Sequence, residues 1–192
     1  MAQEDRERWD ARYRGSGHAS GVPMAALVEL SRWLPDRGRA LDVAGGAGVN
    51  AVWLARRGLE VTVADISAVG LERAAQRAEA QGVELIAVEV DLEEESLPAG
   101  PWALVLCCNY LQRDLLERAA PELGEGGRVV WVHPTVVNLE RHERPGRRFL
   151  LEPGEARTLA EAAGLRVRWA EESWVGEGAE ARHLSRLVAE RC

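Results

Sequence analysis

Residues 40–48 read Ala-Leu-Asp-Val-Ala-Gly-Gly-Ala-Gly, an apolar run that passes into a glycine-rich turn. The run predicts a buried strand, and the apolar residues Val49, Val52 and Trp53 predict an amphipathic helix directly after the turn. Glycines let a ligand approach the backbone closely, and the N-terminus of the following helix favours negative groups. Strand, glycine turn and helix in this order indicate a nucleotide-binding α/β unit.

Strands and helices alternate along the chain from residue 39 onward. The predicted strands are residues 40–44, 60–64, 85–90, 103–107 and 129–133, then 165–170 and 184–189; the predicted helices are residues 49–57, 67–81, 111–120 and 155–163. The segment between the last two strands lacks a helical pattern and contains Gly176 and Gly178. Because a parallel crossover normally needs a helix, we expect an antiparallel hairpin there. The sequence therefore predicts an α/β fold with a Rossmann-like, mostly parallel sheet, helices on both faces and a C-terminal antiparallel hairpin.

Two further helices are predicted before the first strand, at residues 4–13 and 24–34. Residues 14–23, which join them, are rich in glycine and serine and are expected to be mobile. No internal repeat or linker divides the chain of 192 residues. We expect a single domain over residues 1–192, with N-terminal helices and a lid in residues 1–38 and the Rossmann-like core in residues 39–192.

Composition limits the class of function. All 24 basic residues are arginine, which excludes a phosphate-loop lysine, a Schiff-base lysine and the Tyr/Lys pair of short-chain dehydrogenases. The formal net charge of −7 works against binding to nucleic acid, which needs a basic face. Cys107, Cys108 and Cys192 show neither a disulfide framework nor zinc spacing, so no metal site is expected.

The N-terminus is charged throughout, and no apolar run approaches the roughly 20 residues that span a bilayer. We therefore expect a cytoplasmic protein without a membrane partner, as a monomer or a homodimer.

Three acidic residues accompany the predicted glycine turn. Asp65 ends the second strand, where a carboxylate can bind both hydroxyls of a ribose. Asp91 ends the third strand, where it could accept a hydrogen bond from an adenine amino group. Asp42 lies inside the first strand and suits a cationic ammonium group better than a pyrophosphate. Residues 46–51 also fit the dinucleotide pattern G-x-G-x-x-A, so an NAD-dependent oxidoreductase remains an alternative.

Four stretches resemble the successive motifs of class I S-adenosylmethionine-dependent methyltransferases. They are residues 41–48 (Leu-Asp-Val-Ala-Gly-Gly-Ala-Gly), 63–67 (Val-Ala-Asp-Ile-Ser), 91–92 (Asp-Leu) and 123–130 (Leu-Gly-Glu-Gly-Gly-Arg-Val-Val). Residues 8–13, 149–155 and 187–190 are similar to the small bacterial branch that includes the tellurite-resistance methyltransferases and lies near the thiol methyltransferases. The resemblance implies S-adenosyl-L-methionine as cofactor, S-adenosyl-L-homocysteine as product and a small-molecule acceptor. A catalytically silent protein that senses the cofactor is a further alternative.

The resemblance also implies which residues bind the cofactor. Asp42 and the backbone of Ala44, Gly45 and Gly46 would bind the methionine part, and Asp65 would bind the ribose. Ile66, Asp91 and Leu92 would contact the adenine, and Asn109 would line the sulfonium side. Trp9 and Tyr13 would fold over the cofactor. The sequence departs from the family's pattern in three places. Ala44 replaces a glycine and fits if its φ is negative, Val49 stands where this branch commonly has arginine, and Gln112 replaces a frequent histidine.

The acceptor side is less defined by the sequence. Transfer to an amine or hydroxyl acceptor is typically assisted by a general base. His133 and His18 are the candidates for this catalytic role, and ordinary surface or capping roles are the alternative. Tyr110 and Arg113 follow the fourth strand and are candidates for substrate binding. The arginines of residues 141–148, with His142, form either an anion-binding rim or a solvated loop.

Overall fold

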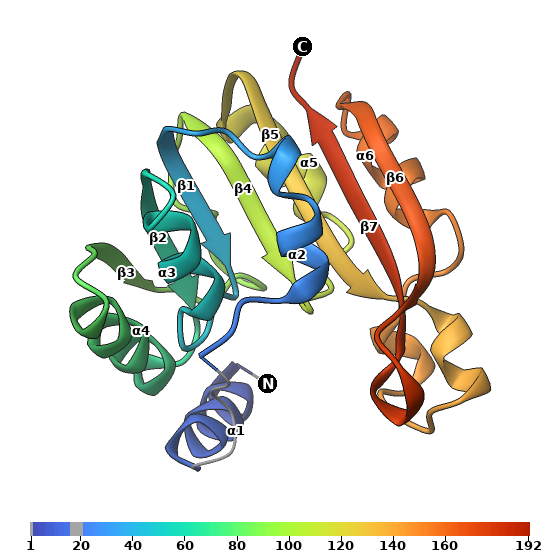
Figure 1. Cartoon of the computed structure of the whole chain (residues 1–192), viewed down its shortest axis with the longest axis horizontal. Coiled ribbons are helices and arrows are strands. Elements are labelled where there is room, and N and C mark those ends of the chain that lie inside the picture. Colours follow the sequence, from blue (N-terminus) through green and yellow to red (C-terminus); the bar gives the residue numbers. More distant parts are fainter. Residues whose placement is uncertain (1, 16–20) are drawn as a thin grey trace.

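The computed structural model describes residues 2–15 and 21–192. These residues form one seven-stranded sheet with the strand order β3-β2-β1-β4-β5-β7-β6 (Figure 1). The strands are β1 (Gly38–Val43), β2 (Leu59–Asp65), β3 (Leu85–Glu89), β4 (Trp102–Cys108), β5 (Leu123–Pro134), β6 (Arg166–Val175) and β7 (Arg182–Glu190). The first five strands are parallel to one another, whereas β7 is antiparallel to both β5 and β6. The predicted Rossmann-like sheet with a C-terminal antiparallel hairpin is confirmed.

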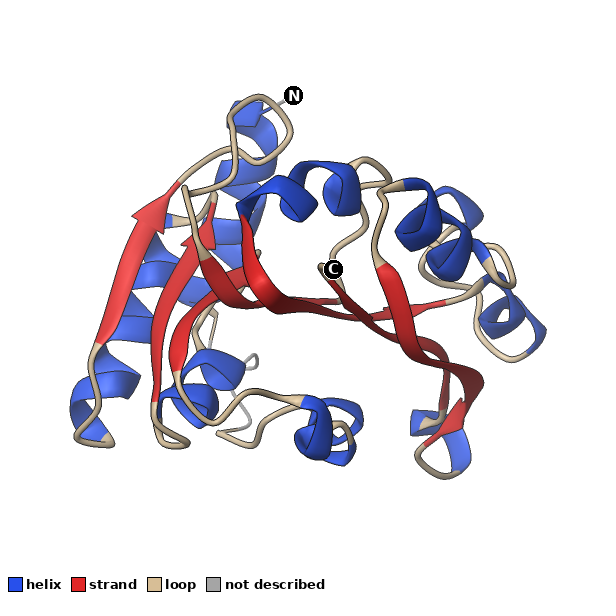
Figure 2. Ribbon diagram, turned by 90° about the horizontal axis from the view of Figure 1, so that it is seen from above, coloured by secondary structure: helices blue, strands red, loops and turns tan. Residues whose placement is uncertain are grey.

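Helices cover both faces of the sheet (Figure 2). The α-helices are α1 (Ala2–Arg14), α2 (Ala25–Glu29), α3 (Val49–Ala55), α4 (Ala68–Ala80), α5 (Leu115–Ala119) and α6 (Glu155–Ala162), and short 3-10 helices span Ser31–Trp33, Ala120–Glu122, Val136–Glu140, Arg147–Phe149 and Gly178–Glu180. None of these helices in residues 2–15 and 21–192 is long and apolar enough to cross a membrane.

Alternate residues of the central strands enter two separate hydrophobic clusters, as the two-residue period of a strand requires. Trp131 of β5 packs in the cluster that contains α5 and α6, whereas its neighbours Val130 and Val132 pack in the cluster that contains α2 and α3. Burial on both faces is why the central strands read as continuous apolar runs. The paired clusters hold the ends of β1, β4 and β5 in fixed relative positions.

Four predicted elements have boundaries that are wrong by more than two residues. The strand predicted for residues 165–170 extends as β6 to Val175. The helix predicted for residues 24–34 is reduced to α2 and a 3-10 turn before Pro35, because a residue preceding proline disfavours the helical conformation. The helix predicted for residues 111–120 begins only at Leu115, because Tyr110 O accepts from Trp131 Nε1 and Gln112 Nε2 donates to Leu92 O. β5 begins at Leu123 rather than Val129, because its first residues pair with Trp102 across a register shift.

Candidate cofactor and active site

The carboxyl ends of β1 and β4 lie side by side at the edge of the sheet where the parallel strands end, which we call the carboxyl edge. From β1 the chain enters α3 on one face, and from β4 it enters α5 on the other face. Ligands of open α/β sheets bind at such a reversal. Among the described residues, Ala44 and Asn109 are the non-glycine residues with positive φ, 52° and 59°, and they directly follow these two strands. Left-handed backbone of this kind costs about 1–3 kcal/mol and clusters at functional sites.

The φ of Ala44 corrects the sequence analysis. Alanine was predicted to fit this position on the condition that its φ is negative, but its φ is +52°. The turn fixes this conformation, because Gly45 N donates to Ala64 O at 3.3 Å and Gly48 N donates to Gly45 O at 3.0 Å. The loop therefore keeps the backbone path of a glycine at Ala44.

Asp42 is buried beneath the glycine turn with 1% of its surface exposed. A Cβ added at Gly45 would lie 2.7 Å from Asp42 Oδ2, so the turn passes directly over this carboxylate. Asp42 Oδ2 has no hydrogen-bond partner among the described residues. Burial, and then the negative charge of Asp65, raise the pKa of Asp42 to about 7. A cationic donor beside Asp42 would relieve both effects.

Asp65 ends β2 and binds the glycine turn itself. Its carboxylate accepts hydrogen bonds from Gly46 N at 2.8 Å and from Ser67 N at 2.9 Å. Burial raises the pKa of Asp65, and these backbone donors oppose that rise. Asp65, the residue predicted to bind the ribose, thus also stabilises the conformation of the glycine turn. Ile66, the next residue, is half-buried.

Asp91 lies beyond the end of β3, and one of its two carboxylate oxygens is free. Oδ1 accepts from Glu93 N at 3.0 Å, whereas Oδ2 is buried and has no partner among the described residues. The neighbouring Leu92 is buried, and its carbonyl accepts from Gln112 Nε2 at 3.0 Å and from Arg118 at 2.6 Å. Gln112, which replaces a frequent histidine of the family, therefore ties the expected adenine segment to the loop after β4.

Tyr13 of α1, which was predicted to fold over the cofactor, lies over the glycine turn. A Cβ built on Gly46 would be 2.0 Å from the Tyr13 hydroxyl oxygen, and one on Gly70 would be 3.0 Å from the Tyr13 ring. Trp9 stacks on Tyr13, with 5.9 Å between ring centroids. Burial, and then the charge of Asp65, raise the pKa of Tyr13, so its hydroxyl stays protonated. Figure 1 shows α1 beyond the carboxyl ends of β1 and β2.

Asp10 is a contact that the sequence analysis missed. Its carboxylate accepts from Ser67 Oγ at 2.5 Å and from Val69 N at 3.4 Å, and Ser67 Oγ in turn accepts from Gly70 N at 3.0 Å. Ser67 is the predicted N-cap of α4, so Asp10 adds a negative charge at the positive end of that helix. An acid in a polar helix gives no sequence signal for a partner 57 residues away.

His133 lies at the end of β5 beside the loop that carries Asn109, whose N–H donates to Val132 O at 2.9 Å. His133 Nε2 donates to Phe149 O at 3.0 Å, because a carbonyl can only accept. Nδ1 therefore carries the lone pair, and it is buried with no partner among the described residues. Burial lowers the pKa of His133 to about 4, so the ring is neutral at neutral pH.

The other acceptor-side candidates point to different places. The Tyr110 hydroxyl donates to Gln112 Oε1 at 2.9 Å, on the side of the β3–β4 loop. Arg113 binds Glu155 at 2.6 Å and Leu150 O at 3.3 Å, which fixes the loop after β4 to α6. Arg113 therefore holds structural partners rather than an open position. His18 lies outside the described residues.

A hollow of about 890 Å³ opens elsewhere, between α3, α4 and the amino-terminal halves of β2 and β3. It shares no residue with the groups just described, so it is separate from this site.

Comparison with known proteins agrees with this geometry. Residues 40–127 match the family model of a methyltransferase domain. These residues therefore match a methyltransferase domain, and the fold of the chain is shared with solved S-adenosylmethionine-dependent methyltransferases. The match begins within β1 and extends into β5, and it contains Asp42, Asp65 and Asp91, so it includes the carboxyl ends of β1 to β4.

Curated relatives match only parts of this domain. The chain is 47% identical to the tRNA 5-carboxymethoxyuridine methyltransferase of Escherichia coli (strain K12) over 54 residues, 28% of this chain and 21% of that protein. It is 36% identical to the putative methyltransferase YqeM of Bacillus subtilis (strain 168) over 106 residues, 52% of this chain and 42% of that protein. The chain thus spans less than half the length of these relatives.

Solved structures share the fold over nearly the whole chain. Magnesium protoporphyrin IX methyltransferase from Synechocystis PCC 6803, with bound SAH, has a TM-score of 0.71 at 17% identity and covers 100% of this chain and 99% of that chain. TehB from Haemophilus influenzae has a TM-score of 0.71 at 12% identity and covers 97% of this chain and 67% of that chain. At such identities the likeness shows the fold alone, so membership of the tellurite-resistance branch stays a prediction.

Proposed function

We propose that the protein transfers the methyl group of S-adenosylmethionine to a small-molecule acceptor and releases S-adenosylhomocysteine. The observation that carries the proposal is the pair of buried carboxylate oxygens without donors, Asp42 Oδ2 and Asp91 Oδ2, which flank Asp65 at the carboxyl edge. A buried acceptor left unsatisfied costs about 1–3 kcal/mol. A ligand that brings one donor to each oxygen recovers that free energy.

The chemistry of the cofactor fits these two oxygens. Its amino-acid ammonium group is a cationic donor for Asp42, and its adenine amino group is a neutral donor for Asp91. A dinucleotide would instead place a pyrophosphate near Asp42 and Asp65, and like charges at such a buried position repel strongly. The arrangement therefore favours S-adenosylmethionine over NAD.

The roles of the chain's own residues follow from their positions. The bound cofactor would supply an electrophilic methyl group on a sulfonium. Trp9 and Tyr13 would cover the glycine turn and limit the access of water. Asn109, which directly follows β4, would line the side of the cofactor site where the sulfonium lies.

His133 is our candidate general base. The acceptor's lone pair forms the new bond to the methyl carbon while the carbon–sulfur bond breaks and its electron pair stays on sulfur. An amine, hydroxyl or thiol acceptor also loses a proton, and Nδ1 of neutral His133 would accept it. Cys107 and Cys108 have no part in this scheme, because burial raises the pKa of both thiols and keeps them protonated.

A turnover screen tests the proposal. The protein is incubated with methyl-labelled S-adenosylmethionine and either a panel of small amines, thiols, phenols and carboxylates or total tRNA, and S-adenosylhomocysteine release is measured. We expect release with at least one small acceptor and only background release with tRNA. Release with tRNA alone would contradict the small-molecule proposal, and release with neither would contradict methyl transfer to these classes.

A further inference from the structure

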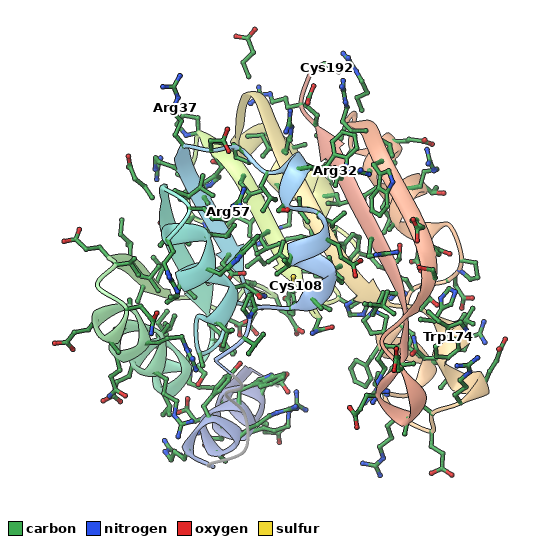
Figure 3. The ribbon with its side chains drawn as sticks, viewed as in Figure 1. Arg32, Arg37, Arg57, Cys108, Trp174 and Cys192 are labelled. Carbon is green, nitrogen blue, oxygen red and sulfur yellow. The ribbon has the colours of Figure 1, made fainter. Side chains whose placement is uncertain are left out.

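Five side chains from three segments meet where the β6–β7 hairpin joins the loop after β5. We call this group the Trp174 cluster; its members are Arg141, His142, Trp174, Arg182 and His183. Figure 3 shows Trp174 on the hairpin. Figure 1 shows that this end of the hairpin and α1 lie at the same end of the strands. The cluster thus belongs to the edge that carries the cofactor residues.

The cluster is built around one indole ring. The Arg141 guanidinium lies 3.9 Å from the centroid of the Trp174 ring, close enough for a cation–π contact. The ring centroids of His142 and His183 lie 6.2 Å and 5.5 Å from that of Trp174, His183 approaching edge-on. His142 Nε2 is 3.1 Å from an Arg182 nitrogen. A flat aromatic surface is therefore surrounded by basic side chains.

The positive charge of Arg141 is not neutralised within the described part of the chain. The ion pairs formed there involve neither Arg141 nor Arg182. The Arg182 guanidinium donates to the carbonyls of Ala179 and Ala181, whereas that of Arg141 has only the ring. Other exposed arginines of the described residues, such as Arg37 and Arg144, also lack an ion pair. What distinguishes Arg141 is its place over an aromatic ring that two histidines also contact.

Other arginines of the same loop differ from Arg141. Arg147 is bound to Glu152 at 2.7 Å, so it serves as a solvated ion pair. Arg148 lies 4.5 Å from the Phe149 ring centroid but has no histidine beside that ring. The loop is thus not one uniform basic rim, and Arg148 provides a matched control for Arg141.

A short path connects the cluster to His133. His183 Nδ1 and Thr135 Oγ1 share a hydrogen bond at 2.7 Å, and Thr135 follows His133 by two residues. At roughly 3.3 Å per residue of extended chain, the two positions are about 7 Å apart. Thr135 and His133 are both buried, so this contact runs through packed side chains and places the cluster beside the segment that carries the candidate base.

We propose that the Trp174 cluster binds the anionic group of the methyl acceptor, a small molecule that carries a carboxylate or a phosphate next to a planar group. The planar part would stack on Trp174, and Arg141 with the histidines would bind the anion through charge-assisted hydrogen bonds. This inference rests on the proposed methyl transfer and names the class of its acceptor. Exposed acids frame the cluster and disfavour an extended polyanion: Glu140, Glu143, Glu177 and Glu180.

The test is a titration followed at the Trp174 indole resonance in a ¹⁵N–¹H spectrum, assigned by its loss in Trp174→Phe. The full-length protein is saturated with S-adenosylhomocysteine and titrated with benzoate, phenyl phosphate, the neutral isostere benzamide or a short single-stranded RNA. We expect benzoate, phenyl phosphate or both to shift the Trp174 signal, and the stronger of the two identifies the anion as carboxylate or phosphate.

Two variants sharpen the result. Arg141→Gln should weaken binding of the aromatic anion about tenfold, because it removes a charge-assisted contact. Arg148→Gln should leave it within about twofold, because an exposed arginine away from the ligand contributes little. Equal binding of benzamide, equal losses in the two variants, or a shift with RNA alone would overturn the inference. Binding of S-adenosylhomocysteine, measured in the same samples, separates this outcome from a failure of the proposed function.

Discussion

The two halves of the carboxyl edge carry opposite charge. At the ends of β1, β2 and β3 lie Asp42, Asp65 and Asp91, all nearly fully buried, and two of them have an oxygen without a donor. Across the sheet, the hairpin end of β6 and β7 carries the basic Trp174 cluster. Acids on one half suit a ligand with cationic and donor groups, and bases on the other suit an anion. In our proposal, the first half binds the cofactor and the second half binds the acceptor.

The largest effect is expected for the residue between the two halves. His133→Gln keeps a donor for Phe149 O but removes the free basic nitrogen, so turnover with an amine or hydroxyl acceptor should fall about a hundredfold or more. The affinity for S-adenosylhomocysteine should stay unchanged, because His133 lies outside the acidic half. Initial rates and calorimetry on the same variant measure both. If the affinity for S-adenosylhomocysteine fell as much as turnover does, cofactor binding and acceptor chemistry would not be separated between the two halves.

The next effect concerns the glycine turn. Gly46→Ala places a Cβ 2.0 Å from the Tyr13 hydroxyl oxygen at a φ of +53°, so the Tyr13 side chain must move. We expect the affinity for S-adenosylhomocysteine to fall about tenfold or more, because the turn and its cover both move. Calorimetric titration measures this loss.

Gly82→Ala is the matched control for Gly46→Ala. Gly82 also has positive φ, +64°, but a Cβ there meets nothing within 4 Å. It should cost about 1 kcal/mol of unfolding free energy through backbone strain and leave cofactor affinity intact. Similar affinity losses in the two variants would mean that strain alone explains the effect.

Replacing Asp65 by alanine should change affinity and stability together. The variant loses the contacts to Gly46 N and Ser67 N as well as the ribose contacts. We expect about a tenfold loss of cofactor affinity and about 1.5–3 kcal/mol less unfolding free energy, measured by calorimetry and denaturant titration. A stable variant with unchanged affinity would show that the ribose is bound elsewhere.

The smallest effect is a pH dependence caused by Asp42. Its folded-state pKa is raised to about 7, so the stability that it contributes is present below its unfolded value and is lost as the pH rises toward 7. Asp42→Asn should flatten that slope in denaturant titrations between about pH 4 and 7. Because a cationic ligand stabilises the ionised carboxylate, binding should release a proton near neutral pH. Calorimetry in buffers of different ionisation enthalpy detects this release, and its absence would place the ammonium group away from Asp42.

The acidic half could be predicted from the sequence, whereas of the basic half only Arg141 and His142 could be, as part of a candidate anion-binding rim. Asp42, Asp65 and Asp91 each lie at a strand end, and strand order together with the short connections brings these ends to one edge. The hairpin of β6 and β7 was predictable because its connection lacks a helical pattern. The Trp174 cluster draws on positions 141 to 183 and depends on side-chain packing across the sheet. The partners of Arg113 and Asp10 are distant in sequence for the same reason, and the positive φ of Ala44 is set by the closure of the turn.

The central claim is that the acidic half binds S-adenosylmethionine, and calorimetric titration of the wild-type protein with S-adenosylhomocysteine and with NAD tests it most directly. We expect S-adenosylhomocysteine to bind with one site per chain and NAD to show no heat of binding. A hundredfold excess over the dissociation constant should add about 2.7 kcal/mol to the unfolding free energy. Asp91→Asn, which keeps the side chain's shape but adds a donor toward the adenine amino group, should weaken the first isotherm. Binding of NAD with no binding of S-adenosylhomocysteine would contradict the account.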